Sequence, residues 1–367
     1  MFYQQPPVGN PVRLSAGQTT AAASHDVFSP YSPRYLASGT AALAAAVIAA
    51  VRLKAVSDPQ VILPAYGCPD LVSAVLYAGA RPVLVDLEPD RHWMDLERVA
   101  ASIKPETVAI IAVNLLGIPE RMDALGALAR ESSVVLIEDS AQAFPQDNDR
   151  TFWSGDLVVL SFGRGKPVSL LGGGAVLFRD AELGSLLPCP ASQGSNTGMA
   201  FRLQAIVYNQ LLSPRLYWLP QGLPFLRLGE TRYRPLAGIH PLDGAREALL
   251  EINIRAYQAE PLDSQAAVAR LLTDTSAAGC GIVDLPAACG LSQAVKLLRY
   301  PILVDRYKRD SLYRCLLGKG QGVSVMYPAI LPGLPGLKSV LAAAGEFPAA
   351  RDFAARLLTL PAYNRLQ

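Results

Sequence analysis

The chain has 367 residues, of which 51% are hydrophobic and only 17% charged, and its formal net charge is +2. The longest uninterrupted apolar run, Ala41 to Val51, is shorter than the ~20 residues of a membrane-spanning helix. The near-neutral charge, without a dense Lys/Arg block, argues against nucleic acid, and five scattered cysteines with three histidines favour reduced thiols over a metal site. We therefore expect a cytoplasmic chain long enough for two lobes, with neither a membrane partner nor a bound metal.

The first half of the chain alternates short apolar runs with helical stretches. The expected strands are Val61 to Pro64, Pro82 to Leu87, Val108 to Asn114, Val134 to Glu138, Leu157 to Phe162 and Ala175 to Phe178. The expected helices between them are Ala41 to Leu53, Leu71 to Ala78, Asp95 to Ile103 and Arg121 to Ala129. Several strands are continuously apolar, which is typical of strands covered on both faces. The pattern predicts an α/β fold with a mainly parallel sheet in a three-layer lobe, whose ligands bind beyond the carboxyl ends of the strands.

The second half of the chain has a weaker pattern. Residues Leu183 to Pro241 are rich in Pro, Tyr and Trp and predict short helices or irregular structure; their aromatic residues Tyr217, Trp218 and Tyr233 could line a sugar or base pocket, although core packing is the commoner role. The remaining predictions are a helix from Leu242 to Leu272, a strand from Tyr300 to Val304, a helix from Arg306 to Leu317, a strand from Val323 to Tyr327 and a helix from Pro348 to Leu358. We expect a large domain over residues 1–240, with an N-terminal arm, and a smaller α+β domain over residues 241–367.

The first candidate for chemistry is Ser38-Gly39-Thr40-Ala41-Ala42-Leu43, which leads directly into an alanine-rich helix. Gly39 permits a close backbone approach, and Thr40 is a candidate for the helix N-cap. The first backbone N–H groups of such a helix suit a phosphate. Taken alone, an ordinary cap without a ligand is the more frequent explanation.

The second candidate is Asp139, which follows the apolar run Val134 to Ile137. At the carboxyl end of a buried strand, its carboxylate can hold a ring nitrogen in the protonated form, because a nearby opposite charge raises the pKa of that nitrogen. Alternatively, Glu138 and Asp139 simply begin the next loop.

The third candidate is Lys166, in the segment Ser161-Phe162-Gly163-Arg164-Gly165-Lys166 after another apolar strand. A neutral lysine amine attacks a carbonyl to form an imine, and the Ser161 hydroxyl can bind a phosphate. A nucleotide P-loop is excluded, because that motif needs Ser or Thr after the lysine, where Pro167 stands, and a glycine where Leu160 stands.

A run of three glycines, Gly172 to Gly174, follows the lysine segment and leads into the strand from Ala175 to Phe178. Consecutive glycines let the backbone pass close to a ligand or a partner chain. A flexible hairpin is the alternative explanation.

In this order, the segments resemble the DegT/DnrJ family of sugar aminotransferases, which depend on pyridoxal 5'-phosphate (PLP) and have the fold-type-I aminotransferase architecture. The matching motifs are SGTAAL, LPAYGCP, AGARPVLVD, EDSAQAF and SFGRGKPVSLLGGGA, between about Tyr35 and Asp180. The resemblance implies that Lys166 forms the internal aldimine with PLP and then shuttles a proton between the donor Cα and C4′ of the cofactor. It also implies the other cofactor contacts: Asp139 at the pyridinium nitrogen, Gln142 beside the ring near its phenolic oxygen, and Gly39, Thr40, Ala41 and Ser161 at the phosphate.

The chain departs from the family pattern at several positions. Pro167 follows the lysine where the family usually has Asn, and the usual acid is missing at Gly172. Cys68 stands where the family brings an aromatic ring onto the cofactor, with Tyr66 two residues earlier as a replacement for stacking. The segment from Leu183 to Pro241, which often shapes the substrate pocket, also matches poorly.

The resemblance implies an aminotransferase of sugar-nucleotide and polysaccharide biosynthesis. It would transfer the amino group of an amino-acid donor, glutamate, to a nucleotide-linked keto-sugar. It would also be a homodimer with shared active sites, near which Arg164 and the glycine run are expected. The alternatives are a non-sugar keto substrate, a non-catalytic or regulatory protein of the same fold, and a sugar dehydratase, which Lys166 disfavours because the family's dehydratases typically have histidine at that position.

Overall fold

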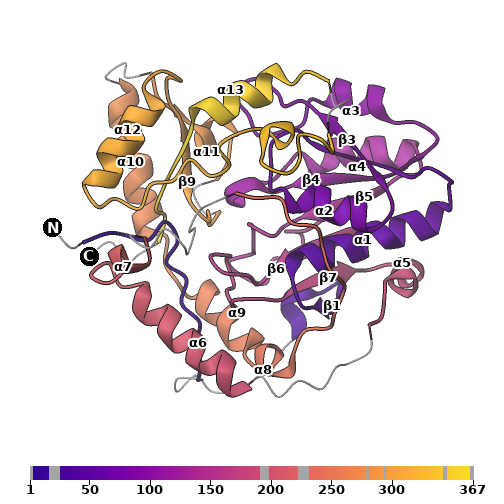
Figure 1. Cartoon of the computed structure of the whole chain (residues 1–367), viewed down its shortest axis with the longest axis horizontal. Helices are drawn as coiled ribbons and strands as arrows, with labels where there is room; N and C mark the ends of the chain where they lie inside the picture. Colours follow the sequence, from indigo (N-terminus) through magenta and orange to yellow (C-terminus); the bar gives the residue numbers. More distant parts are fainter. Residues whose placement is uncertain are drawn as a thin grey trace.

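A seven-stranded sheet forms the centre of the larger lobe (Figure 1). The computed structural model describes residues 3–15, 25–190, 198–221, 231–277, 281–292, 295–341 and 345–363. The strands are β1 (Ser32–Leu36), β2 (Gln60–Pro64), β3 (Arg81–Val85), β4 (Thr107–Val113), β5 (Val135–Asp139), β6 (Leu157–Ser161) and β7 (Gly174–Phe178), in the spatial order β1-β7-β6-β5-β4-β2-β3. β2 to β6 are mutually parallel, whereas β7 is antiparallel to both of its neighbours. The mainly parallel sheet is confirmed, and six of its seven strands were predicted.

Helices cover both faces of this sheet. They are α1 (Gly39–Lys54), α2 (Asp70–Tyr77), α3 (Leu96–Ser102), α4 (Met122–Glu131) and α5 (Ala181–Leu186). Successive residues of β6 point to opposite faces: Leu157 and Val159 join the core that contains α1, whereas Val158 and Leu160 join a second core. Burial on both faces explains why β6 is continuously apolar.

The middle of the chain is helical, and the single helix predicted from Leu242 to Leu272 is wrong. The structure has α6 (Gly198–Leu211), α7 (Trp218–Gln221), α8 (Gly244–Glu247), α9 (Leu250–Gln258) and α10 (Asp263–Ala277). Asp243 caps α8, where its Oδ1 accepts the Arg246 N–H at 3.1 Å. Pro261 lies between α9 and α10, and proline has no N–H with which to continue a helix. None of the described helices is long and apolar enough to cross a membrane.

The smaller lobe contains a three-stranded antiparallel sheet in the order β10-β9-β8. Its elements are β8 (Val283–Asp284), α11 (Leu285–Ala288), β9 (Tyr300–Leu303), α12 (Arg309–Gly318), α13 (Pro348–Arg356) and β10 (Leu357–Leu360). The strand predicted over Val323–Tyr327 is wrong: the segment forms one bridge, from Ser324 to Thr359, and Met326 has a φ of 56°, which an extended strand does not accommodate. The helix predicted to Leu358 ends at Arg356, because the next residues pair with β9. The α+β character of this lobe is confirmed, and the domain division at residue 240 stays a prediction.

An N-terminal arm, residues 3–15, runs across the rest of the molecule. Near the smaller lobe, the Gln5 N–H donates to the Gly320 carbonyl at 2.8 Å, and the Tyr363 hydroxyl donates to the Pro6 carbonyl at 2.5 Å. Further along, the Val12 N–H donates to Asn209 Oδ1 on α6 at 2.9 Å. The arm therefore joins the smaller lobe to the helices beside the larger one.

Candidate active site

The carboxyl end of β5 places the Asp139 carboxylate in the interior, beside β4 and β6. Its Oδ1 accepts the Ala141 N–H at 3.0 Å, and within the described ranges no donor is recorded for Oδ2. Burial raises the pKa of Asp139, and the nearby positive charge of Lys166 opposes that rise. Asp139 is thus a buried carboxylate with a cation beside it and one oxygen available to a ligand.

A buried polar network around Glu138 fixes the end of β5. Glu138 Oε1 accepts a hydrogen bond from Asn114 Nδ2 at 2.8 Å, and Glu138 Oε2 accepts hydrogen bonds from the Ser154 and Gly155 N–H groups, each at 2.9 Å. The neighbouring Ser140 Oγ accepts the Trp153 indole N–H at 3.0 Å. Fully paired buried groups of this kind hold a unique geometry, so Glu138 has a positioning role. Its place next to Asp139 is the one sign of this role along the chain.

The start of α1 lies against the end of β6. The N-cap is Ser38, whose Oγ accepts the Ala41 N–H at 3.0 Å, so the prediction of Thr40 as the cap is wrong. Thr40 lies in the first turn of the helix, and its hydroxyl donates to Asp70 Oδ2 at 3.0 Å. Ser38 takes the cap position because its backbone is extended, as an N-cap requires, whereas Thr40 is already helical.

Gly39 and Ser161 form a tight junction at this helix start. A Cβ on Gly39 would lie 2.6 Å from Ser161 Cβ and 2.7 Å from Ser161 Oγ. Gly174 is packed as tightly, because a Cβ there would lie 2.8 Å from Gly39 Cα. The glycine run is therefore no free hairpin: it lets β7 and α1 approach, and it leaves the Ser161 hydroxyl at the positive end of a helix.

The Lys166 loop is tied down from two sides. Asn10 of the N-terminal arm donates from Nδ2 to the carbonyls of Lys166 at 3.0 Å and Pro167 at 3.1 Å. Gly165 turns the chain with a φ of 71°, a conformation that glycine adopts without strain. Burial raises the pKa values of Cys68 and Asp139, and the nearby positive charge of Lys166 opposes both rises. The structure thus brings together Lys166, Cys68 and Asp139, which are far apart in sequence.

Sequence reasoning missed Tyr327, which reaches the site from the smaller lobe. Its hydroxyl accepts Gln142 Nε2 at 3.0 Å, and Gln142 Oε1 in turn accepts the Leu116 N–H at 3.0 Å. Tyr66 packs edge-on against Tyr327, with ring centroids 5.6 Å apart. The Tyr66 hydroxyl donates to the Tyr327 carbonyl at 3.1 Å. Burial raises the pKa of Cys68 to about 12, so Cys68 is a neutral thiol. The apolar pattern predicts a strand at Tyr327, and no motif marks this residue.

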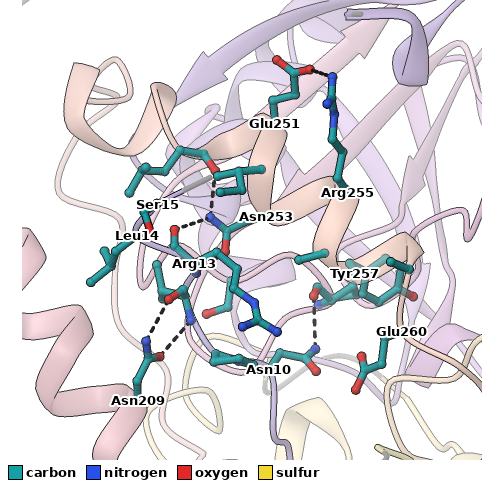
Figure 2. A pocket seen from close by; sticks show the side chains of 18 of the residues that line it. Asn10, Arg13, Leu14, Ser15, Asn209, Glu251, Asn253, Arg255, Tyr257 and Glu260 are labelled. Atoms are coloured by element: carbon teal, nitrogen blue, oxygen red, sulfur yellow. Dashed lines mark hydrogen bonds and ion pairs between the residues drawn. The ribbon is translucent and has the colours of Figure 1, made fainter. Parts of the chain in front are cut away.

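A basin of about 1090 Å³ opens beside the Lys166 loop, between the N-terminal arm, α6 and α9 (Figure 2). Pro167 and Ser169 from the loop line it, together with Arg13 and Arg255. The N-terminal arm forms one wall of the basin. It is held there by a hydrogen bond from the Arg13 N–H to Asn253 Oδ1 at 2.8 Å. Glu251 and Glu260 line it as well, and Glu251 pairs with Arg255. The basin therefore has a mixed-charge lining beside the lysine loop.

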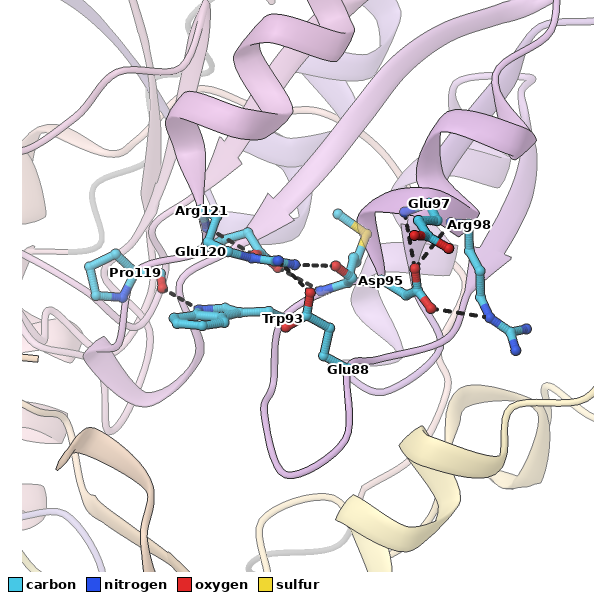
Figure 3. Close-up of polar contacts among 9 residues, drawn as sticks. Glu88, Trp93, Asp95, Glu97, Arg98, Pro119, Glu120 and Arg121 are labelled. Carbon is cyan, nitrogen blue, oxygen red and sulfur yellow. Dashed lines mark hydrogen bonds and ion pairs between the residues drawn. The ribbon is translucent and has the colours of Figure 1, made fainter. Parts of the chain in front are cut away.

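A second polar cluster lies at the carboxyl end of β4 (Figure 3). Buried Glu120 accepts the N–H groups of Met94 and Arg121, each at 2.9 Å, and its own N–H donates to Asn114 Oδ1 at 3.0 Å. The Arg121 guanidinium pairs with Glu88 and covers the Trp93 ring at 5.1 Å. Burial raises the pKa of Glu120 to about 7. Through Asn114, this cluster is connected to Glu138 and hence to the site.

Residues 35–213 match the model of the DegT/DnrJ/EryC1/StrS aminotransferase family. This segment belongs to that family. The match contains α1, the Asp139 strand end and the Lys166 loop, which are the parts that meet in the structure. The predicted resemblance is therefore confirmed for the segment that forms the candidate site.

Two curated relatives act on nucleotide-linked sugars by name. A UDP-N-acetyl-3-dehydro-alpha-D-glucosamine 3-aminotransferase of Acidithiobacillus ferrooxidans is 40% identical over 150 residues, 40% of each protein. A UDP-2-acetamido-2-deoxy-3-oxo-D-glucuronate aminotransferase of Pseudomonas aeruginosa is 33% identical over 140 residues, 37% of this chain and 39% of the relative. The matched segments thus span only about two fifths of these relatives.

Two solved structures share the fold over most of the chain. DesV of S. venezuelae, in complex with a ketimine intermediate, superimposes with a TM-score of 0.66 at 24% identity, covering 91% of this chain and 80% of DesV. The PLP form of the sugar aminotransferase Spr1654 of Streptococcus pneumoniae gives 0.65 at 19% identity, covering 100% and 95%. The fold class predicted from the sequence is confirmed.

Proposed function

We propose that this protein is a PLP-dependent aminotransferase that moves an amino group from an amino-acid donor, glutamate, to a nucleotide-linked keto-sugar. One observation carries the proposal: a buried carboxylate, a lysine and a serine hydroxyl at a helix start meet at one edge of the sheet, inside the family segment. The names of the curated relatives support the sugar acceptor. A homodimer with shared active sites, in the cytoplasm, is part of the proposal and rests on the family resemblance.

The residues present fit the cofactor. The free oxygen of Asp139 suits a protonated ring nitrogen, because the carboxylate is buried and a buried charge needs a partner. The junction of Gly39 and Ser161 presents a hydroxyl and the N-terminus of α1, which together suit a phosphate. The hydroxyl of Thr40 and the N–H of Ala41 are already bonded within the protein, so we assign the phosphate to Gly39, Ser161 and the helix start.

When bound, PLP supplies an electron sink that stabilises negative charge at the Cα of an amino-acid substrate. Asp139 keeps the ring nitrogen protonated and thereby maintains that sink. Lys166 anchors the cofactor, takes up the proton released from the donor Cα and holds it for delivery to the acceptor carbon. Gln142 is held at both ends of its amide, by Leu116 and Tyr327, and can orient the ring without moving.

We assign the acceptor to the basin beside the lysine loop. Its volume is sufficient for a nucleotide-linked sugar, and the guanidinium group of Arg13 suits a diphosphate. Arg255, which also lines the basin, pairs with Glu251. Asn10 couples this basin to the site, because it lines the basin and also holds the Lys166 carbonyl.

Reconstitution with PLP tests the proposal. A visible absorption band should form with the wild-type protein and with Lys319→Ala, a surface lysine control, and should be missing in Lys166→Ala. Glutamate should convert the band to the aminated form, and a panel of nucleotide-linked keto-sugars should restore it. If no band forms with excess PLP, the cofactor proposal is wrong; a band that no amino donor converts would instead support the non-catalytic alternative, and restoration by small keto acids alone would support a non-sugar acceptor.

A further inference from the structure

Exposed apolar side chains are concentrated on α6 and the segment that ends in α7. Of the thirteen large hydrophobic residues that are exposed in the described ranges, seven fall between residues 199 and 219: Met199, Leu203, Ile206, Val207, Leu216, Trp218 and Leu219. We call these seven residues the α6–α7 face. Met199 and Leu203 are exposed to 86% and 63%, and exposed apolar side chains gathered on one element of a folded protein mark an interaction site.

The face lies on the outer side of the molecule. On α6 its members are spaced four, three and one residues apart, which places them on one side of the helix. Phe201 and Ala205, on the opposite side, are buried in the core, with Phe201 under the Arg246 guanidinium at 4.4 Å. α6 and α7 run along one edge of the molecule (Figure 1). The helix is therefore apolar on both sides, and only its inner side has a partner among the described residues.

The segment that contains the α6–α7 face has basic but no acidic side chains. Residues 183–229 contain three arginines and neither aspartate nor glutamate, although the whole chain has 31 acidic residues. Arg202 on α6 and Arg215 before α7 are both exposed. Arginine at the edge of an apolar face can extend its charged end to an anionic surface while its stem covers apolar surface.

Two occupants are conceivable for such a face, and the charge distinguishes them. A two-fold contact with a second copy would bring the same patch against itself. Arg202 and Arg215 would then be brought against the partner's copy of the patch, and residues 183–229 contain no acidic residue to neutralise them, which is unfavourable. An anionic lipid surface offers the complementary charge, and leucine, tryptophan and arginine on a helix lying in the membrane plane are typical of interfacial binding.

We propose that the α6–α7 face docks the protein on an anionic lipid bilayer, with α6 lying in the plane of the headgroups. This differs from the expectation of no membrane partner, which rested on the lack of a spanning run and a dense basic block. Interfacial binding requires neither, because an exposed apolar side and a few arginines suffice.

Vesicle co-sedimentation of the PLP-loaded full-length protein tests the proposal. The wild-type protein should bind vesicles of phosphatidylcholine with phosphatidylglycerol, and bind pure phosphatidylcholine at least tenfold more weakly. Leu203→Glu/Ile206→Glu should reduce binding to the anionic vesicles at least tenfold, whereas Tyr307→Glu, at a more exposed apolar position elsewhere, should not change it. Arg202→Gln/Arg215→Gln should reduce binding about tenfold at low salt and less at high salt.

The same variants are compared by light scattering after gel filtration. Their mass and circular dichroism should equal those of the wild type, because the substituted side chains are exposed. If the glutamate variant has a lower mass than the wild type, the face is a contact between copies and the proposal is wrong. Failure of the wild type to bind anionic vesicles at low salt, or equal binding of the wild type and the glutamate variant, would also overturn it.

Discussion

Substitution of Gly39 by alanine tests the junction that we assign to the cofactor phosphate. The new Cβ would lie 2.6 Å from Ser161 Cβ and 2.7 Å from Ser161 Oγ, well inside van der Waals contact, so Ser161 or the start of α1 must move. Overpacking of this kind costs about 1–3 kcal/mol, while the better helix propensity of alanine offsets up to about 1 kcal/mol. We expect a net loss of about 1–2 kcal/mol in the free energy of unfolding. PLP affinity should fall by about 10- to 100-fold, because one hydrogen bond to a charged group contributes about 1.5–3 kcal/mol.

Urea unfolding of the cofactor-free protein measures the first quantity, and titration of the visible PLP band measures the second. The matched background is Ser161→Gly, which removes both clashing atoms and leaves Ser161 Cα at 3.3 Å as the next contact. In the Ser161→Gly background, Gly39→Ala should lower the free energy of unfolding by less than about 0.5 kcal/mol, as for a substitution that makes no such clash. An equal cost in both backgrounds, or unchanged PLP affinity in the single variant, would refute the geometry of the junction.

Three further substitutions test other parts of the structure. Tyr327→Phe leaves Gln142 Nε2 buried without its acceptor and should lower the free energy of unfolding by about 1–3 kcal/mol; an unchanged urea midpoint would contradict this. Burial raises the pKa of Glu120 from 4.5 to about 7, so its contribution to stability is present below pH 4.5 and is lost as the pH rises through 7. Glu120→Gln should therefore remove about 3 kcal/mol of the difference in the free energy of unfolding between pH 4.5 and pH 8. If the wild type and Glu120→Gln show the same pH dependence of stability, the titration of Glu120 is not its cause. Arg13→Ala should raise KM for the nucleotide-linked acceptor about tenfold and leave the glutamate half-reaction unchanged; a slower half-reaction would place Arg13 outside the acceptor site.

The sheet and most of its helices could be predicted because strands buried on both faces consist of continuous apolar runs, which are recognisable in the sequence. The runs Val134 to Ile137 and Leu157 to Leu160, shortly before Asp139 and Ser161, are continuously apolar, and the carboxyl ends of their strands meet at one edge. β1 was missed because Ser32–Leu36 contains proline and arginine, which are tolerated at this position because β1 is an edge strand.

The candidate site was only partly predictable. Asp139 and Ser161 end strands of the matched segment and Lys166 follows one, so order along the chain was enough to bring them together. Tyr327 and Asn10 were missed, because their contacts with Gln142 and the Lys166 loop span 185 and 156 residues along the chain. A local pattern carries no information about partners at that separation. The exposed side of α6 was missed for a different reason: apolar periodicity indicates a helix but does not say which side is covered.

The N-terminal arm imposes an order on biosynthesis. Its partners lie far downstream: the carbonyl of Lys166 is 156 residues from Asn10, Asn253 is 240 residues from Arg13, and Tyr363 is 357 residues from Pro6. The arm leaves the ribosome before any of them has been synthesised, and its contacts with Asn253 and Tyr363 must wait until most of the chain has followed. The central sheet, whose last strand ends at Phe178, can therefore form before the arm is fully anchored. A cofactor that arrives at that stage meets a lysine loop whose arm is held at fewer points than in the finished fold.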